Sequence, residues 1–221
     1  MTQITGAMAT RKYEASGVQA EFEPGSRNRV LRNLLGIVRA RDMEDAESEQ
    51  LERIQREAVG RYERTHRFLT SDICELHRLW LRPIYSWAGE YRTVDLGKGG
   101  FVFAHAARIP TLMTEFESGT LYRRTPCTAR DPAEVAAALA EVHAELILIH
   151  PFRDGNGRLA RMVAALMALQ SGLPELDFRP LVERGKRKYV AAIHAAMGRD
   201  YEPLAGLFRR AIDRTVASNR R

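Results

Sequence analysis

This sequence is poor in cysteine and has no long apolar run, and both absences narrow the class of protein. Its two cysteines, Cys74 and Cys127, are too few and too far apart for a disulfide framework or a zinc set. We therefore expect a reducing compartment, and hence a cytoplasmic location. No apolar run reaches the roughly eighteen residues of a membrane span, and residues 1–11 lack the apolar stretch of a signal peptide. We expect no membrane segment.

Other familiar signatures are missing as well. The six histidines form no His-Glu-x-x-His pattern, and the chain has neither internal repeats nor low-complexity tracts. Its formal net charge of +6 suits a polyanionic nucleotide or an acidic target face. The basic run at 184–188 is more typical of a solvated loop and helix start than of a nucleic-acid site. We expect no nucleic-acid partner.

Apolar periodicity predicts an all-α chain. Residues 1–23 carry glycines without periodicity, so we expect a loosely ordered lead-in before a single domain over 24–217. Outside the motif described next, helices are expected near 28–37, 43–63, 71–82, 107–118, 185–197 and 203–217. A short hairpin near 96–104 is the only β-structure that the sequence predicts.

The most informative window is His-Pro-Phe-Arg-Asp-Gly-Asn-Gly-Arg-Leu-Ala-Arg, residues 150–161. Asp131-Pro132-x-Glu134 marks a helix start, and apolar residues spaced by three and four up to Ile149 predict that this helix ends at His150, before Pro151. A second apolar stripe, over 159–169, predicts a helix that begins at the glycines. Unpaired N–H groups and the helix dipole make such an N-terminus an anion site.

The polar residues of the window add the remaining parts of a phosphate site. Arg158 and Arg161 share one helix face and can hold a polyphosphate, while Asp154 is placed to hold a divalent cation. An unperturbed histidine side chain titrates near neutral pH, so His150 is a residue type that can take a proton from a hydroxyl. Each residue alone has a plainer interpretation, such as a helix cap or a solvated face. The combination favours a site.

This window resembles the signature His-Pro-Phe-x-Asp-Gly-Asn-Gly-Arg-x-x-Arg of the Fic (filamentation-induced-by-cAMP) family and matches all nine specified positions. Upstream, the segment 87–92, Trp-Ala-Gly-Glu-Tyr-Arg, resembles the family's Trp-Ala-Gly-x-x-Arg, and the likeness spans roughly 24–210. The resemblance implies a Fic-type helical bundle with a short β-hairpin flap. It also implies transfer of AMP from ATP to a Ser, Thr or Tyr hydroxyl of a target protein, with release of pyrophosphate.

The resemblance assigns a role to each motif position. His150 would be the general base, Asp154 would bind Mg²⁺ between the α- and β-phosphates, and Phe152 would be the buried anchor of the loop. The residues that would bind the ATP phosphates are Gly155, Asn156, Gly157, Arg158 and Arg161.

Two further assignments rest on position in the family. The flap would dock an extended target segment by strand addition, although a Gly-Gly turn is typical of any short hairpin. Its residues are Lys98, Gly99, Gly100, Phe101, Val102 and Phe103. Tyr189 would flank the adenine, and a half-buried aromatic on an amphipathic helix is an equally good interpretation.

Regulation is where the sequence departs from part of the family. Many Fic proteins carry an inhibitory Ser/Thr-x-x-x-Glu-Gly/Asn helix whose glutamate pairs with the second motif arginine, here Arg161. No Ser/Thr-x-x-x-Glu of this chain is followed by Gly or Asn, and Thr10/Glu14 is the least implausible internal candidate. We therefore expect the toxin half of a toxin-antitoxin pair, restrained by a small antitoxin chain that supplies a glutamate to Arg161.

Other functions stay open at this point. The Doc branch of the family phosphorylates its target, but it resembles His-Pro-Phe-x-x-Ala-Asn-Lys-Arg, and Gly157-Arg158 stands here where that branch has lysine. UMP or phosphocholine transfer on the same scaffold is a further alternative. So is a non-catalytic module that binds a nucleotide or a partner, which the intact His150 and Asp154 disfavour.

Overall fold

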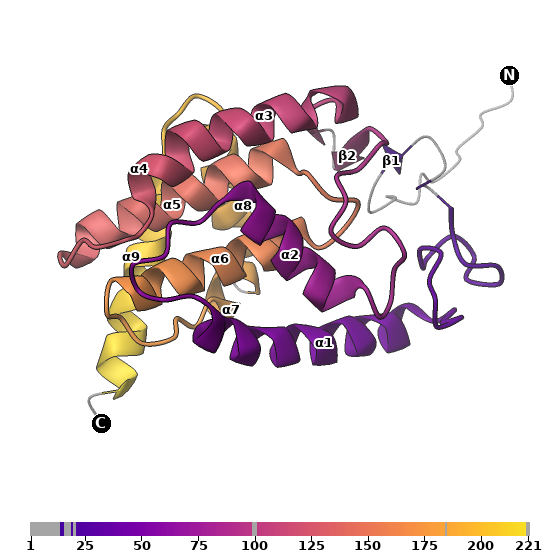
Figure 1. Ribbon diagram of the computed structural model, residues 1–221, viewed down its shortest axis with the longest axis horizontal. Coiled ribbons are helices and arrows are strands. Elements are labelled where there is room, and N and C mark those ends of the chain that lie inside the picture. The colour runs from indigo at the N-terminus through magenta and orange to yellow at the C-terminus, as the bar shows by residue number, and fades with distance from the viewer. Residues whose placement is uncertain (1–13, 16–18, 20, 99–100, 184, 220–221) are drawn as a thin grey trace, which may run out of the picture.

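The computed structural model describes residues 14–15, 19, 21–98, 101–183 and 185–219, and it is mostly helical (Figure 1). Its helices are α1 (Ala40–Arg61), α2 (Thr70–Leu81), α3 (Ile109–Phe116), α4 (Tyr122–Arg124), α5 (Pro132–Ile149), α6 (Asn156–Gln170), α7 (Arg179–Val182), α8 (Lys186–Ala196) and α9 (Glu202–Asn219). A 3-10 turn, Ala106–Arg108, precedes α3, and a π-helical segment, Glu117–Leu121, continues α3 into α4. The strands are β1 (Glu14–Ala15), β2 (Leu96–Lys98) and β3 (Phe101–Val102).

Helix α5 lies at the centre of the core. The Asp131 side chain accepts a hydrogen bond from the backbone N–H of Ala133 at 3.2 Å, and Pro132 occupies the first turn. Buried residues then follow on nearly every face of the helix, which packs against α3, α6, α8 and α9. Helix α1 and the α3–α4 stretch lie on opposite sides of the molecule (Figure 1). This arrangement holds the C-terminus of α5 and the N-terminus of α6 in fixed positions.

The hairpin predicted near 96–104 is confirmed. Strand β2 pairs antiparallel with β3, with Gly97 opposite Val102 and Lys98 opposite Phe101. The sequence does not predict β1, which pairs with the other edge of β2 and makes a three-stranded sheet. Gly99 and Gly100, at the predicted turn, lie outside the described residues.

Most of the predicted helices are confirmed, with shifted ends. They appear as α1, α2, the stretch from α3 to α4, α5, α6, α8 and α9, while the short α7 is not predicted. Most of the lead-in expected over 1–23 lies outside the described residues, so the domain boundary at 24 stays a prediction. Among the helices that the structure describes, none is long and apolar enough to cross a membrane.

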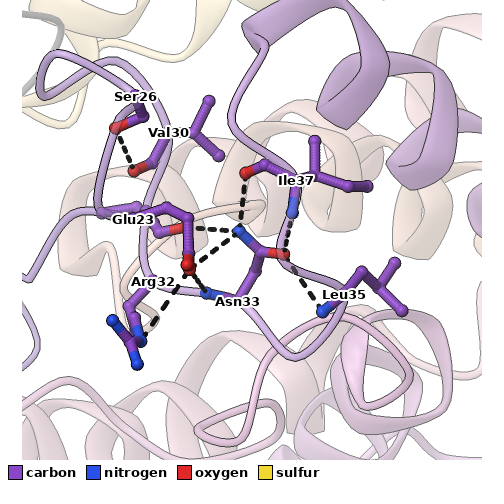
Figure 2. A network of polar contacts seen from close by, with 8 residues as sticks. Glu23, Ser26, Val30, Arg32, Asn33, Leu35 and Ile37 are labelled. Carbon is purple, nitrogen blue, oxygen red and sulfur yellow. Dashed lines mark hydrogen bonds and ion pairs between the residues drawn. The ribbon is translucent and has the colours of Figure 1, made fainter.

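The helix predicted near 28–37 is wrong, and a buried asparagine explains why. The side-chain oxygen of Asn33 accepts hydrogen bonds from the backbone N–H groups of Leu35 (3.1 Å) and Ile37 (2.9 Å), as Figure 2 shows. Its nitrogen donates to the Ile37 carbonyl at 2.9 Å and lies 3.4 Å from the Glu23 carboxylate. These bonds offer the backbone an alternative to the helical ladder, so apolar spacing misleads here.

Candidate functional site

The motif window lies where two core helices meet, as the sequence predicts. Helix α5 ends at His150, whose backbone is left-handed (φ 53°, ψ 59°), and Gly155 is the left-handed N-cap of α6 (φ 82°). Residues 151–155 form the connection. The first N–H groups of α6 therefore point toward the loop, which is the anion-site geometry expected of a helix N-terminus.

The loop is closed by its own side chains. The Asn156 side chain accepts from the Phe152 N–H at 2.9 Å and donates to the Phe152 carbonyl at 2.7 Å. Phe152 is fully buried, and its ring stacks on His77 at 3.9 Å between centroids. Since the Asn156 side chain bonds the loop in both directions, the backbone N–H is the group of this residue that suits a phosphate.

His77, on α2, packs against the loop through Phe152 and Asp154. The sequence motifs do not identify this residue. Its Nδ1 accepts from the Gly89 N–H at 2.8 Å, and its Nε2 lies 3.1 Å from the Asp154 carbonyl, so a neutral ring protonated on Nε2 satisfies both. Burial lowers the pKa of His77 to about 4, which keeps the ring neutral at pH 7. The one available signal is a histidine three residues before Trp80, on a buried helix face.

Arg92 ties the loop to the hairpin. Its Nε donates to the His150 carbonyl at 2.8 Å, and its backbone N–H donates to the Pro151 carbonyl at 2.8 Å. The same guanidinium donates to the carbonyls of Val94 and Ala104, which flank β2 and β3. The side chain is buried, and this burial lowers the pKa of its guanidinium. The sequence places Arg92 in a family segment but predicts no role for it.

His150 is held in an orientation that suits a base. Its Nδ1 lies 3.1 Å from the Ile147 carbonyl, and the Phe103 ring stacks on the imidazole at 3.7 Å between centroids. A neutral ring that donates from Nδ1 carries its basic lone pair on Nε2. Phe103 belongs to the predicted flap, so the hairpin lies directly against the candidate base.

The rest of the flap is only partly described. Phe101 stacks on His194 of α8 at 5.6 Å, and the Val102 side chain is 70% exposed. Gly99, Gly100 and the side chain of Lys98 lie outside the described residues. The docking role of the flap stays a prediction.

Asp154 and the glycines line the N-terminus of α6. The Asp154 carboxylate accepts from the Gly155 N–H at 2.6 Å, and a Cβ on Gly155 would lie 2.7 Å from the Trp80 ring, so only glycine fits. Within the described chain no cluster of three or more His, Cys, Asp or Glu residues would hold a metal alone. One carboxylate beside a phosphate site fits Mg²⁺, which takes most of its other ligands from water and substrate phosphates.

Both motif arginines line a cavity of about 510 Å³. The other lining residues are Leu51 and Gln55 of α1, Ala165 of α6 and the segment 175–179, which includes the acidic residues Glu175 and Asp177. Arg158 pairs with Glu47 at 2.6 Å, whereas Arg161 forms no ion pair with any carboxylate that the structure describes. Burial disfavours the charged form of Arg161 and so lowers its pKa. An anion in the cavity would offset this cost by stabilising the charged guanidinium.

Tyr189, on α8, interacts electrostatically with Arg161 and lies within hydrogen-bond distance of a second buried histidine, His143. Its hydroxyl is 2.8 Å from His143 Nε2, and burial lowers the pKa of His143 to about 3. His143 is therefore a packed neutral residue and not a second base. The proximity of Tyr189 to the adenine stays a prediction.

The comparisons with known proteins agree with this geometry. Residues 67–168 match the profile of the Fic/DOC family. The chain is 32% identical over 146 residues to the probable protein adenylyltransferase Fic of Salmonella typhimurium, covering 63% of this chain and 68% of that protein. It is 31% identical over 163 residues to the protein adenylyltransferase VbhT of Bartonella schoenbuchensis, covering 73% of this chain but 33% of VbhT. The match thus spans about a third of VbhT.

A solved structure shows the same fold. The BepC protein of Bartonella tribocorum, crystallised with bound AMPPNP, superposes with a TM-score of 0.66 over 82% of this chain and 91% of that chain, at 22% identity. The sequence similarity, the fold and the motif between α5 and α6 all point to the same family. The chain belongs to the Fic/DOC family.

Proposed function

We propose that this protein transfers AMP from ATP to a hydroxyl side chain of a target protein. The observation that carries the proposal is the placement of a candidate base, His150, at the end of α5, directly before a helix N-terminus with two arginines on one cavity. Relatives named protein adenylyltransferase and a neighbour solved with AMPPNP support it. The proposed site residues are His150, Phe152, Asp154, Gly155, Asn156, Gly157, Arg158 and Arg161.

The reaction follows from the geometry of the base. His150 takes the hydroxyl proton on Nε2 while the target oxygen attacks the α-phosphorus. A new P–O bond forms, the bond to the β-phosphate oxygen breaks, and pyrophosphate leaves with the electron pair. The Nδ1 bond to the Ile147 carbonyl and the stacked Phe103 keep the ring oriented for this step.

The residues proposed to bind the phosphates would stabilise the charge of the transition state. The N–H groups at the start of α6, together with Arg158 and Arg161, face the charge that grows on the leaving oxygens. Asp154 would hold Mg²⁺, and the ion would supply further positive charge at the phosphate site. The protein itself forms no covalent bond, so in this proposal the rate enhancement comes mainly from positioning the hydroxyl and the phosphates.

Labelled ATP tests the proposal directly. After incubation of the full chain and Mg²⁺ with cell lysate, we expect α-labelled ATP to label a protein band that is absent without the chain, and γ-labelled ATP to add no such band, because the α-phosphorus is the proposed centre. Label from the γ-position alone would establish kinase chemistry instead. Parallel reactions with α-labelled UTP and with labelled CDP-choline separate AMP transfer from UMP and phosphocholine transfer. A chain that binds ATP yet transfers nothing would be the non-catalytic alternative.

We further propose restraint by a separate antitoxin in the cytoplasm. Arg161 lacks a described carboxylate partner, so a partner helix with Ser/Thr-x-x-x-Glu-Gly/Asn has a cation to bind. We expect the lone protein to modify itself with Mg²⁺ and ATP and to be toxic in bacteria. Such a helix should suppress both effects, and the same helix with glycine for glutamate should not.

The Arg161→Ala variant should weaken both catalysis and control by the helix. A different result would show that the inhibition comes from within the chain. If the lone protein is inert and deletion of residues 1–22 activates it, a glutamate within the chain, such as Glu14, does the blocking. Thr10 and the Glu14 side chain lie outside the described residues.

A further inference from the structure

Helix α1 places a buried carboxylate on the first motif arginine. Glu47 is 5% exposed and lies on the buried stripe of α1 with Met43, Ile54 and Ala58. Its Oε2 lies 2.6 Å from a terminal nitrogen of Arg158. Although burial opposes the charge of Arg158, the carboxylates of Glu47 and Asp154 raise the pKa of its guanidinium above the ordinary value.

Two aromatic residues hold this pair in place. The Tyr85 hydroxyl donates to Glu47 Oε1 at 2.6 Å, and the Trp80 indole N–H donates to the Glu47 carbonyl at 2.8 Å. The Trp80 ring also lies under the Arg158 guanidinium, 4.7 Å from Cζ to the ring centroid. The carboxylate therefore fixes one edge of the guanidinium, and the indole fixes one face.

Stability alone does not explain this arrangement. A buried ion pair contributes little net stability compared with apolar residues of the same volume, because both charges lose their hydration. The chain nevertheless places a glutamate on an apolar stripe, against the arginine that lines the cavity. Arg158 lines the cavity and Glu47 is not among the lining residues, so the ion pair joins α1 to a guanidinium of the cavity wall.

We propose that Glu47 is a positioning residue that presents Arg158 to the β-phosphate of the nucleotide. The inference rests on the proposed function, in which Arg158 binds the phosphates beyond the α-phosphate. In this inference the Glu47–Arg158 ion pair, which joins α1 to α6, helps the protein to distinguish ATP and ADP from AMP. Arg161, which forms no ion pair with a described carboxylate, would then bind the γ-phosphate.

The Glu47→Gln variant tests this inference by calorimetry with ATP, ADP and AMP. Glutamine keeps the volume and a hydrogen bond to Tyr85 but removes the charge that orients Arg158. We expect the Kd for ATP and for ADP to rise about tenfold, the usual effect of losing one charge-assisted hydrogen bond. The Kd for AMP, which lacks a β-phosphate, should change by less than about twofold.

A matched control exists on α5. Glu141 is also a buried glutamate, and it pairs with Arg123 and Arg124 at 2.7 Å each. Glu141→Gln should alter thermal stability without altering affinity for any of the three nucleotides.

A second variant, Tyr85→Phe, keeps the ion pair but removes the hydroxyl that holds Glu47. It should also weaken the binding of ATP and ADP, by a smaller factor.

Each of the following results would overturn the inference. Tighter ATP binding by Glu47→Gln would make Glu47 a competitor of the phosphate. Equal losses for AMP, ADP and ATP, or equal losses in Glu141→Gln, would make its role structural. If the wild-type chain binds and transfers AMP while Glu47→Gln behaves as wild type, this inference fails and the proposed function stands. A wild-type chain that binds none of the nucleotides overturns both.

Discussion

Replacing His150 by alanine is expected to lower AMP transfer by a factor of about 10² to 10⁴ while ATP affinity stays within a few-fold. In the proposed mechanism the imidazole acts on the target hydroxyl, whereas the start of α6 and the two arginines that line the cavity bind the phosphates. Transfer of label from α-labelled ATP measures the first quantity, and calorimetry measures the second.

The backbone of His150 calls for a second variant. Its φ of 53° is left-handed, a conformation that costs alanine more than asparagine. His150→Asn keeps that backbone without providing a base of suitable pKa, so it should lose transfer to a similar extent and remain folded. Loss of ATP binding in both variants would show that His150 shapes the loop and is not the base.

The second large effect is expected at Gly155. A Cβ there would lie 2.7 Å from the Trp80 ring, and the residue has a φ of 82°. Gly155→Ala should lower the free energy of unfolding by about 2 to 5 kcal/mol, since a left-handed alanine costs about 1 to 2 kcal/mol and an overpacked contact about 1 to 3 kcal/mol. It should also abolish ATP binding, because the start of α6 must move away from Trp80. Urea unfolding and calorimetry measure the two effects.

Two other glycines separate the causes. Gly36 has a φ of 65°, and a Cβ added there would have no neighbour within 4 Å, so Gly36→Ala reports the backbone cost alone. Gly60 lies in α1 with open space around it, and Gly60→Ala should stabilise the protein by about 0.5 to 1 kcal/mol. If Gly155→Ala costs no more than Gly36→Ala, Trp80 yields to the methyl group and the steric argument is wrong.

The sequence predicts the helices and the motif because both depend on local spacing. Periodicity places His150 at a helix end and Gly155 at a helix start, and the structure agrees. It fails near 28–37, where Asn33 provides a competing set of hydrogen bonds. It does not find the supports of the motif, since His77, Arg92 and Glu47 meet partners far away in the chain. Their common signal is a polar residue at a buried position, which identifies a candidate but not its partner.

The Asn33 network also affects how the segment opens. Most of the hydrogen bonds that hold residues 33–37 converge on one side chain, so they are gained and lost together (Figure 2). The segment therefore behaves as a small cooperative unit in spite of its irregular backbone. We therefore expect the amides of Leu35 and Ile37 to share a single opening event, so that hydrogen exchange at the two positions should report the same free energy. A connection without helix or strand thereby acquires the all-or-none behaviour of a regular element.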